Sequence, residues 1–172
     1  MILIIDIYIN NEKIDIVKEN NDWKYNFKKE GKYTLNIKFK NIITNMRAFF
    51  EKSSNIISLD FSYFNTSNIS NMALLFSHCN KLKEIKWINN FITNKVSYMN
   101  SMFQGCYELE YLYLSNFDSS NVSKMNHKFA ICHKLKEIKG IDKFITNKVT
   151  DMQAKFNACG ALEYLYLANF NT

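Results

Sequence analysis

The sequence of 172 residues contains no proline, only four glycines and a single arginine, Arg47. Proteins that read nucleic acid usually carry clustered Arg and Lys on an element that enters a groove. Here the formal net charge is a mild +6, spread along the chain, so we expect no nucleic-acid partner. The abundance of Ile, Lys, Asn, Phe and Tyr is typical of an AT-rich genome, which bears on origin and not on activity.

Long apolar runs are also missing. No segment approaches the roughly 18 apolar residues of a membrane-spanning helix. Near the N-terminus, Asp6 follows Met1 after only four apolar residues, without the basic region and longer apolar stretch of a secretory signal. We therefore expect a soluble intracellular protein with no membrane span, and the alternative is a protein of the cell surface.

What the sequence does contain is one unit written five times. Each unit opens on a methionine, at spacings of 26, 27, 26 and 27 residues: Met46, Met72, Met99, Met125 and Met152. Four positions later stands a phenylalanine: Phe50, Phe76, Phe103, Phe129 and Phe156. Seven positions later stands Ser53, Cys79, Cys106, Cys132 or Cys159. A fixed period of this length is the signature of a solenoid, in which stability comes from stacking neighbouring units.

Each repeat has the same predicted local structure. Two residues before each methionine stands a Ser or Thr, a preferred helix N-cap: Thr44, Ser70, Ser97, Ser123 and Thr150. The Met, Phe and Cys positions fall within one helical stripe, which predicts a helix of roughly two turns. A Leu-x-x-Leu-x-Leu segment follows, for example Leu82, Ile85 and Trp87. Its last positions alternate, which predicts one short strand per repeat in a parallel sheet.

Residues 1–43 carry no copy of the repeat and have the pattern of strands. Ile5, Ile7 and Ile9 alternate with polar or amphipathic residues. Segments 23–27 and 33–39 alternate in the same way around a loop containing Gly31, which predicts a β-hairpin. We therefore expect an α/β protein in which residues 1–43 form an antiparallel β cap over the first repeat. Residues 44–172 form a leucine-rich-repeat-like solenoid of five repeats of 26–27 residues, each a short helix plus a parallel strand.

The repeat resembles a known family. Its pattern C-x-x-L-x-x-L-x-L-x-x-F-[NDI]-[TS]-x-x-V-[ST]-x-M-x-x-x-F is similar to the BspA-type leucine-rich repeats, also described as mycoplasma lipoprotein-like repeats of unknown function. The resemblance covers residues 44–172. It implies a leucine-rich-repeat-like solenoid and a surface role in adhesion, and it implies no catalytic residues.

A longer period is superposed on the first. The stretch Lys-Leu-Lys-Glu-Ile-Lys at 81–86 returns at 134–139, and Leu-Glu-Tyr-Leu-Tyr-Leu at 109–114 returns at 162–167. The duplicated unit is therefore 53 residues long.

The outward strand positions form the candidate binding surface. Beyond Ser58 and Asp60 of the first repeat, the two columns consist of Glu84, Lys86, Tyr111, Tyr113, Glu137, Lys139, Tyr164 and Tyr166. If the register holds, Lys139 lies between Tyr113 and Tyr166, where its ammonium can contact the rings. Tyrosine is enriched in interface cores, so we expect this face to bind a protein partner. The alternative is that these side chains only solubilise and stabilise the sheet.

The four cysteines recur at the interval of a whole repeat, whereas zinc ligands usually come in pairs two to four residues apart. We expect a column of buried structural thiols and neither a metal site nor a cofactor; disulfides between adjacent repeats are the alternative. His78 beside Cys79 and His133 beside Cys132 also leave open a Cys-His enzyme. We expect no catalytic residues, because the helical stripe directs the cysteines inward and their neighbours elsewhere.

The last repeat ends directly after Phe170 without a polar cap. An uncovered solenoid end exposes a strand edge and apolar core, so we expect this end to stack on another copy or another protein, or the chain to be a fragment. The expected function is a non-enzymatic binding or assembly scaffold, with a BspA-like surface adhesin as the alternative.

Overall fold

The structure is a computed structural model that describes residues 5–9, 12–14, 17–19, 22–24 and 35–167. The chain divides into two compact units, Met1–Ile43 and Thr44–Thr172, which are described separately.

The first unit is built from antiparallel strands. Strand β1 (Ile5–Ile9) pairs with β2 (Glu12–Ile14) on one side and with β5 (Leu35–Phe39) on the other. Strand β3 (Val17–Glu19) pairs with β4 (Asp22–Lys24).

The predicted hairpin between segments 23–27 and 33–39 is wrong. The described part of the first segment pairs with β3, and the described part of the second pairs with β1. The intervening loop with Gly31 lies outside the described residues. Alternation identified the strands, but it carries no information on which strand is the partner.

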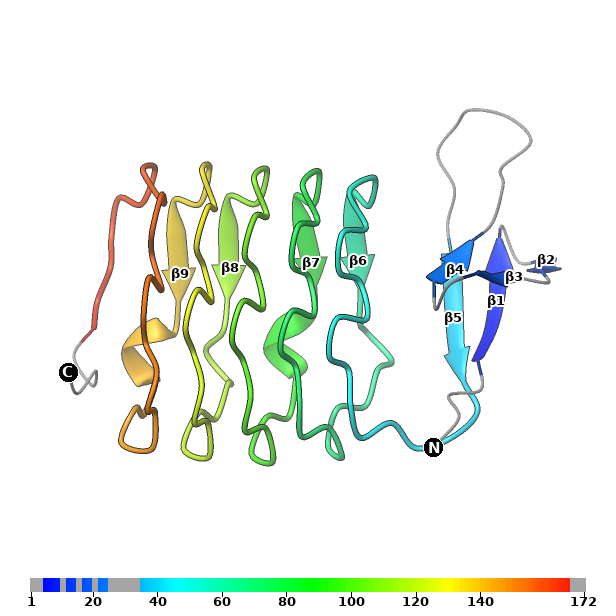
Figure 1. Ribbon diagram of the computed structural model, residues 1–172, viewed down its shortest axis with the longest axis horizontal. Coiled ribbons are helices and arrows are strands. Elements are labelled where there is room, and N and C mark those ends of the chain that lie inside the picture. Colours follow the sequence, from blue (N-terminus) through cyan, green and yellow to red (C-terminus); the bar gives the residue numbers. More distant parts are fainter. Residues whose placement is uncertain (1–4, 10–11, 15–16, 20–21, 25–34, 168–172) are drawn as a thin grey trace. The chain divides into compact units, whose positions relative to one another are not determined.

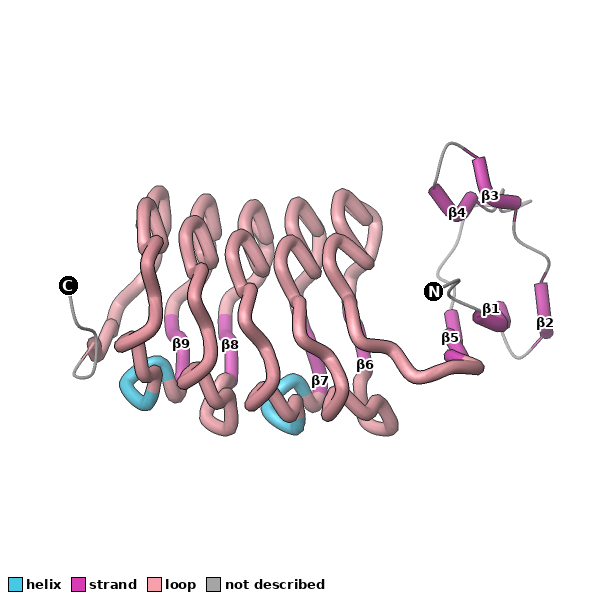
Figure 2. Tube along the Cα trace, turned by 60° about the horizontal axis from the view of Figure 1, so that its bottom comes forward, coloured by secondary structure: helices cyan, strands magenta, loops and turns pink. Residues whose placement is uncertain are grey.

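In the second unit the repeats lie side by side as successive coils (Figure 1), and the tilted view of Figure 2 agrees. One parallel ladder of backbone bridges crosses all five coils at the residue before each methionine: Asn45, Asn71, Tyr98, Lys124 and Asp151. Equivalent positions of neighbouring repeats are therefore in register along the whole described stack.

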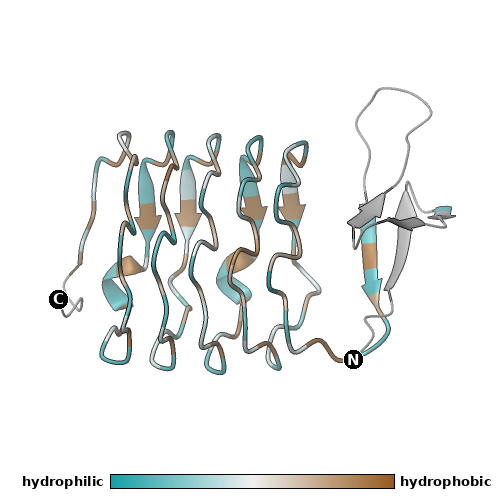
Figure 3. Cartoon of the chain, viewed as in Figure 1, coloured by the Kyte–Doolittle hydropathy of each residue, from teal (hydrophilic) through white to brown (hydrophobic). Residues whose placement is uncertain are grey.

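On the opposite side of each of the first four coils lies the short strand that the sequence predicts, whereas the described part of the fifth coil has only a bridge at Tyr164. Strand β6 (Ser58–Asp60) pairs in parallel with β7 (Glu84–Lys86), and β8 (Tyr111–Tyr113) pairs in parallel with β9 (Glu137–Lys139). No ladder joins β7 to β8, all of whose residues are described. The sheet therefore consists of two pairs instead of one continuous surface. The middle residue of each strand faces the core, and Figure 3 shows the resulting mixture of hydrophilic and hydrophobic residues along the arrows.

The predicted two-turn helices are absent from the described coils. In their place, alternate residues donate backbone N–H groups to the next coil. In the second coil Met72, Leu74, Phe76 and His78 donate to carbonyls of the third at 2.6–3.0 Å. The residues between them close turns within the coil, as when the Leu75 N–H donates to the Met72 carbonyl at 3.3 Å. The segment is thus a chain of turns that extends the parallel ladder.

This conformation depends on left-handed residues at two fixed places in every coil, two and six positions after the methionine. They are Ala48, Lys52, Leu74, His78, Ser101, Gly105, His127, Ile131, Ala154 and Ala158, with φ between 50° and 71°. A positive φ at the third of the four residues in a turn is characteristic of a type II turn. Only one of the ten is glycine, and the left-handed region costs other residues about 1–2 kcal/mol. Coil-to-coil hydrogen bonds must offset that cost.

The Ser and Thr residues before each methionine do not cap helices. The hydroxyls of Ser70, Ser123 and Thr150 each donate to the carbonyl of the equivalent residue in the preceding coil, at 3.1–3.2 Å. A short hydroxyl side chain suits this position because it adds a second bond to an acceptor that already receives the backbone N–H of the same residue.

The core consists of columns that run through the stack. Successive rings of Phe50, Phe76, Phe103, Phe129 and Phe156 stack with centroids 5.5–5.8 Å apart and planes within 22°. The methionines of the first four coils are at most 1% exposed. Repetition of one side chain in register therefore gives each coil the same packing surface for its neighbour.

The alternation between 26 and 27 residues has a structural cause. In the second and fourth coils the chain leaves the strand through a left-handed residue, Trp87 or Gly140, and enters a short 3-10 helix, η1 (Ile88–Asn90) or η2 (Ile141–Lys143). That turn contains the extra residue. The prediction that Trp87 lies on the buried side of its strand is wrong, since it is 52% exposed and Ile88 fills the core position.

The left-handed positions can be tested in the fifth coil. Replacing the exposed Ala158, at φ 56°, by Gly removes a steric cost, and we expect the free energy of unfolding to rise by about 0.5–1 kcal/mol. Ala161 does not have a positive φ, so Ala161→Gly is the matched control and should lower it by a similar amount. Urea denaturation measures both, and equal destabilisation by the two variants would contradict the turn geometry.

Candidate functional site

The outward strand residues lie where the sequence predicts them. The parallel register places Tyr111 beside Glu137 and Tyr113 beside Lys139. A further bridge places Tyr164 beside Glu137. In the other pair, Glu84 lies beside Ser58 and Lys86 beside Asp60. Because no ladder joins β7 to β8, the two columns are interrupted between the second and third coils.

The face is aromatic and open. Tyr111 and Tyr113 are each 47% exposed, Tyr164 is 61% exposed and Tyr166 is 70% exposed. Tyr166 lies in the fifth coil, beyond the last described strand. These side chains therefore present ring surface without any change in the backbone.

Lysines from the next coil lie over two of the tyrosine rings. The Lys139 ammonium is 5.3 Å from the centroid of the Tyr113 ring, and that of Lys136 is 5.7 Å from the Tyr111 ring. Lys136 also pairs with Glu110 at 2.6 Å, and this pairing raises the pKa of the lysine and lowers that of the carboxyl. The predicted contact of Lys139 with Tyr113 is thus present, and such contacts limit the freedom of both side chains.

Within each charged strand the two outward side chains have opposite sign. Glu84 pairs with Lys86, and Glu137 with Lys139, each at 3.8 Å. Long, exposed pairs of this kind contribute little to stability. They leave each strand of the face with no net charge.

The four cysteines form the predicted column of thiols, and all four are free. Each Sγ donates to the carbonyl of a phenylalanine in the preceding coil at 2.8–3.2 Å, as Cys79 does to Phe50. Burial raises the pKa of Cys79 to about 12 and also raises that of Cys106 well above its usual value. Such thiols are poor nucleophiles at neutral pH.

The side chains of the histidines next to these cysteines pack against residues of neighbouring coils. The His78 ring lies against Gly105 of the next coil, where an added Cβ would come within 2.6 Å of Nδ1. The His133 ring packs against Tyr107 with centroids 5.2 Å apart. The sequence neighbours therefore do not form a Cys-His pair.

Cys159 differs from the others because it is only partly buried. A hydrogen bond with the Cys132 side chain lowers its pKa to about 7, and the same bond together with burial raises the pKa of Cys132. Cys159 thus differs from the other three thiols in both its exposure and the direction of its pKa shift.

A buried lysine is the feature that the sequence analysis missed. Lys128 is fully buried, and its ammonium lies 4.5 Å from the centroid of the Phe144 ring and 5.4 Å from those of Phe117 and Phe129. It also contacts the Met99 Sδ atom at 3.3 Å. Burial lowers the pKa of Lys128 well below its usual value, with a further contribution from the nearby Lys155.

Lys155 occupies the same position one coil later and is 6% exposed. Burial lowers its pKa to about 8. The position is three residues after the methionine, where the earlier coils carry Phe49, Leu75 and Met102. Reading this column across the repeats would have found the lysines, because a change from apolar to charged at one inward position is visible without a structure.

The buried lysines predict a pH-dependent stability. The unfolded chain holds their protons up to about pH 10.4, whereas the folded chain releases them earlier, so stability should rise with pH. For Lys155 the rise falls between about pH 8 and about pH 10.4, and Lys128 contributes in the same direction. Lys128→Met, which copies Met102, should raise the free energy of unfolding at pH 7 by roughly 1–3 kcal/mol, since it replaces a buried ammonium by an apolar side chain.

Denaturant titrations between pH 6 and pH 10.5 measure this dependence. The exposed Lys124 supplies the control variant Lys124→Met, which should leave the slope unchanged. A Lys128→Met protein that is less stable than the wild type at pH 7 would contradict the account.

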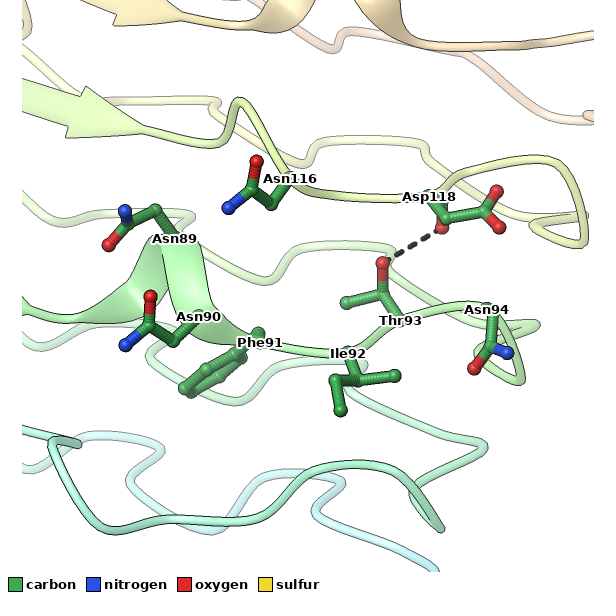
Figure 4. A pocket seen from close by; sticks show the side chains of 8 residues that line it. All are labelled: Asn89, Asn90, Phe91, Ile92, Thr93, Asn94, Asn116 and Asp118. Atoms are coloured by element: carbon green, nitrogen blue, oxygen red, sulfur yellow. Dashed lines mark hydrogen bonds between the residues drawn. The ribbon is translucent and has the colours of Figure 1, made fainter.

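A shallow pocket of about 450 Å³ lies between η1 with the residues that follow it in the second coil and the neighbouring segment of the third coil (Figure 4). It is lined by Asn89, Asn90, Phe91, Ile92, Thr93, Asn94, Asn116 and Asp118. The Thr93 hydroxyl donates to the Asp118 backbone carbonyl at 2.9 Å across the pocket. Hydrogen bonds from Ser120 lower the pKa of the Asp118 carboxyl. Four of the eight lining residues are asparagines, and the others include the apolar Phe91 and Ile92 and the acidic Asp118.

The described part of the chain contains no group of three or more His, Cys, Asp or Glu side chains that could hold a metal ion. None of its helices has the length and apolar character needed to cross a membrane. The predicted assembly surface at the end of the last repeat includes residues 168–172, which lie outside the described residues.

Comparison with known proteins gives a family without an activity. A family described as "Mycoplasma protein of unknown function, DUF285" matches residues 21–137. Neither a curated protein nor a solved structure matches the chain.

Proposed function

Since the chain belongs to the DUF285 family of Mycoplasma proteins of unknown function, which assigns no activity, we propose a function from the geometry. We propose that residues 44–167 form a solenoid that acts as a non-enzymatic protein-binding scaffold. The binding surface is the strand face that carries Tyr111, Tyr113, Glu137 and Lys139, extended by Glu84, Lys86, Tyr164 and Tyr166.

The observation that carries this proposal is the exposure of a preformed tyrosine pair. Tyr111 and Tyr113 lie on a regular strand, are about half exposed, and have lysines over their rings. Tyrosines are frequent energetic anchors of interfaces. Because the backbone and the rings are already held, a partner gains contact area with little loss of conformational entropy.

The cysteines and histidines of the repeats also support a non-enzymatic scaffold. Buried thiols with raised pKa and histidines packed on neighbouring coils are poor material for nucleophilic catalysis. Stacked coils joined by hydrogen bonds, in contrast, provide a rigid surface whose side chains can vary without loss of the fold.

A more specific role is that of a BspA-like adhesin on the cell surface. The five-fold repeat pattern, which resembles BspA-type leucine-rich repeats, favours this second candidate. Biotinylation of intact cells with a reagent that does not cross membranes distinguishes the two, because only a surface protein would be labelled before lysis.

The binding face is tested by replacing its anchors. We expect Tyr111→Ser with Tyr113→Ser to keep the fold, since both side chains point outward, and to weaken partner binding by well over tenfold. Immobilised protein is incubated with a lysate of the cells that produce it, and the retained proteins are quantified by mass spectrometry.

The control for this experiment is Tyr63→Ser, at a fully exposed tyrosine outside the strands. A partner of the face is retained by the wild type and by the control, and is lost from the double variant. If the three proteins retain the same set in the same amounts, the face is not the binding surface.

A further inference from the structure

We propose that the partner of the strand face is a second copy of this chain, so that two faces pack against each other as a symmetric dimer. This inference rests on the proposed function, because it names the occupant of the same surface.

The argument begins with the order of charges along the strands. In β7 and in β9 the first outward residue is a glutamate and the last is a lysine: Glu84 with Lys86, and Glu137 with Lys139. In β8 both outward residues are tyrosines, and positions 164 and 166 repeat them. Each charged strand is therefore complementary to itself read backwards, and each tyrosine strand is identical to itself read backwards.

Two-fold symmetry makes use of this property. An interface of this type brings the same patch of both subunits together, so the patch must be self-complementary. Consider a two-fold axis that lies between the two faces and runs along the direction in which the coils stack. It reverses the strands but keeps the order of the coils, so that each strand faces its own copy.

The resulting contacts are favourable at every coil from the second to the fifth. Glu84 faces the Lys86 position of the other copy, and Glu137 faces its Lys139 position. Tyr111 faces the Tyr113 position, where rings can stack. An axis along the strands would instead reverse the order of the coils and keep the strand direction. It would place glutamate opposite glutamate when centred on a coil and glutamate opposite tyrosine when centred between coils, so no glutamate would face a lysine.

The charge of the face also argues for a second copy over an unrelated partner. Each glutamate has a lysine of its own strand within 3.8 Å, so the face has no net charge with which to attract a strongly acidic or basic protein. The Glu137 and Lys139 side chains remain 36% and 52% exposed. They can therefore exchange partners between copies with little additional desolvation.

The dimensions of the face set the strength of the dimer. The strands are three residues long, about 10 Å, and coils are spaced at about 4.8 Å. Four coils of this width present only about 200 Å² per copy, well below the roughly 800 Å² per partner of a stable interface. We therefore expect a weak dimer that dissociates on dilution and whose affinity falls with added salt.

The test is sedimentation velocity of the full chain over a concentration series at low and high salt. Lys86→Glu with Lys139→Glu makes both charged strands acidic, and Glu84→Lys with Glu137→Lys makes both basic. Each single-sign variant should bind itself at least tenfold more weakly than the wild type binds itself. Mixing the acidic and the basic variant should restore a dimer.

A matched control carries all four substitutions. Exchanging Glu84 with Lys86 and Glu137 with Lys139 reverses every strand and keeps the face self-complementary, so this variant should dimerise like the wild type. Circular dichroism checks that each protein is folded.

Two results would overturn the inference: a wild type that stays monomeric at the highest soluble concentration, or single-sign variants that dimerise as well as the wild type. If the wild type is monomeric but Tyr111→Ser with Tyr113→Ser loses a retained protein, the face binds another partner and only this inference fails. If substitution of the tyrosines changes neither self-association nor the retained proteins, the proposed function fails with it.

Discussion

The ladder of hydrogen bonds between coils is the interaction on which the rest of the second unit depends. Each coil from the first to the fourth donates four backbone N–H groups from its methionine segment to the next coil. Those groups can point to the neighbour only because the second and the sixth residue after each methionine adopt the left-handed conformation. Stacking of the phenylalanines then buries apolar rings along the same direction, so hydrogen bonding and packing stabilise the same register.

The same register determines what the strand face presents. Because equivalent residues lie directly beside each other, a repeated sequence becomes a repeated surface, and the 53-residue duplication appears as alternating charged and tyrosine strands. The extra residue in every second coil, contained in η1 and η2, accompanies the break between β7 and β8. After η2, in contrast, Glu137 of β9 stays bridged to Tyr164 of the fifth coil, so the extra residue does not by itself interrupt the sheet.

Much of this could be predicted from the sequence. The inward columns of Met, Phe and Cys follow from their spacing, and the outward strand residues follow from alternation. The prediction of a helix is wrong because a chain of turns, like a helix, directs the methionine and the residues four and seven positions after it to the same side. The left-handed conformation at two positions of each coil leaves almost no trace in the sequence, because Gly105 is the only glycine among the ten residues that adopt it there. The burial of Lys128 cannot be predicted from its own repeat alone, because the signal is the change from apolar to charged residues at one position across the repeats. Trp87 is exposed although alternation places it inward, because alternation does not indicate where a strand ends.

The most direct test of this account is a measurement of couplings across hydrogen bonds in labelled protein by NMR. The account predicts a correlation between the Leu74 amide nitrogen and the Asn100 carbonyl carbon, and another between Phe76 and Met102, since these groups are bonded at 3.0 and 2.9 Å. Correlations from these two amides to carbonyls four residues earlier in the same coil would show helices instead and would contradict it.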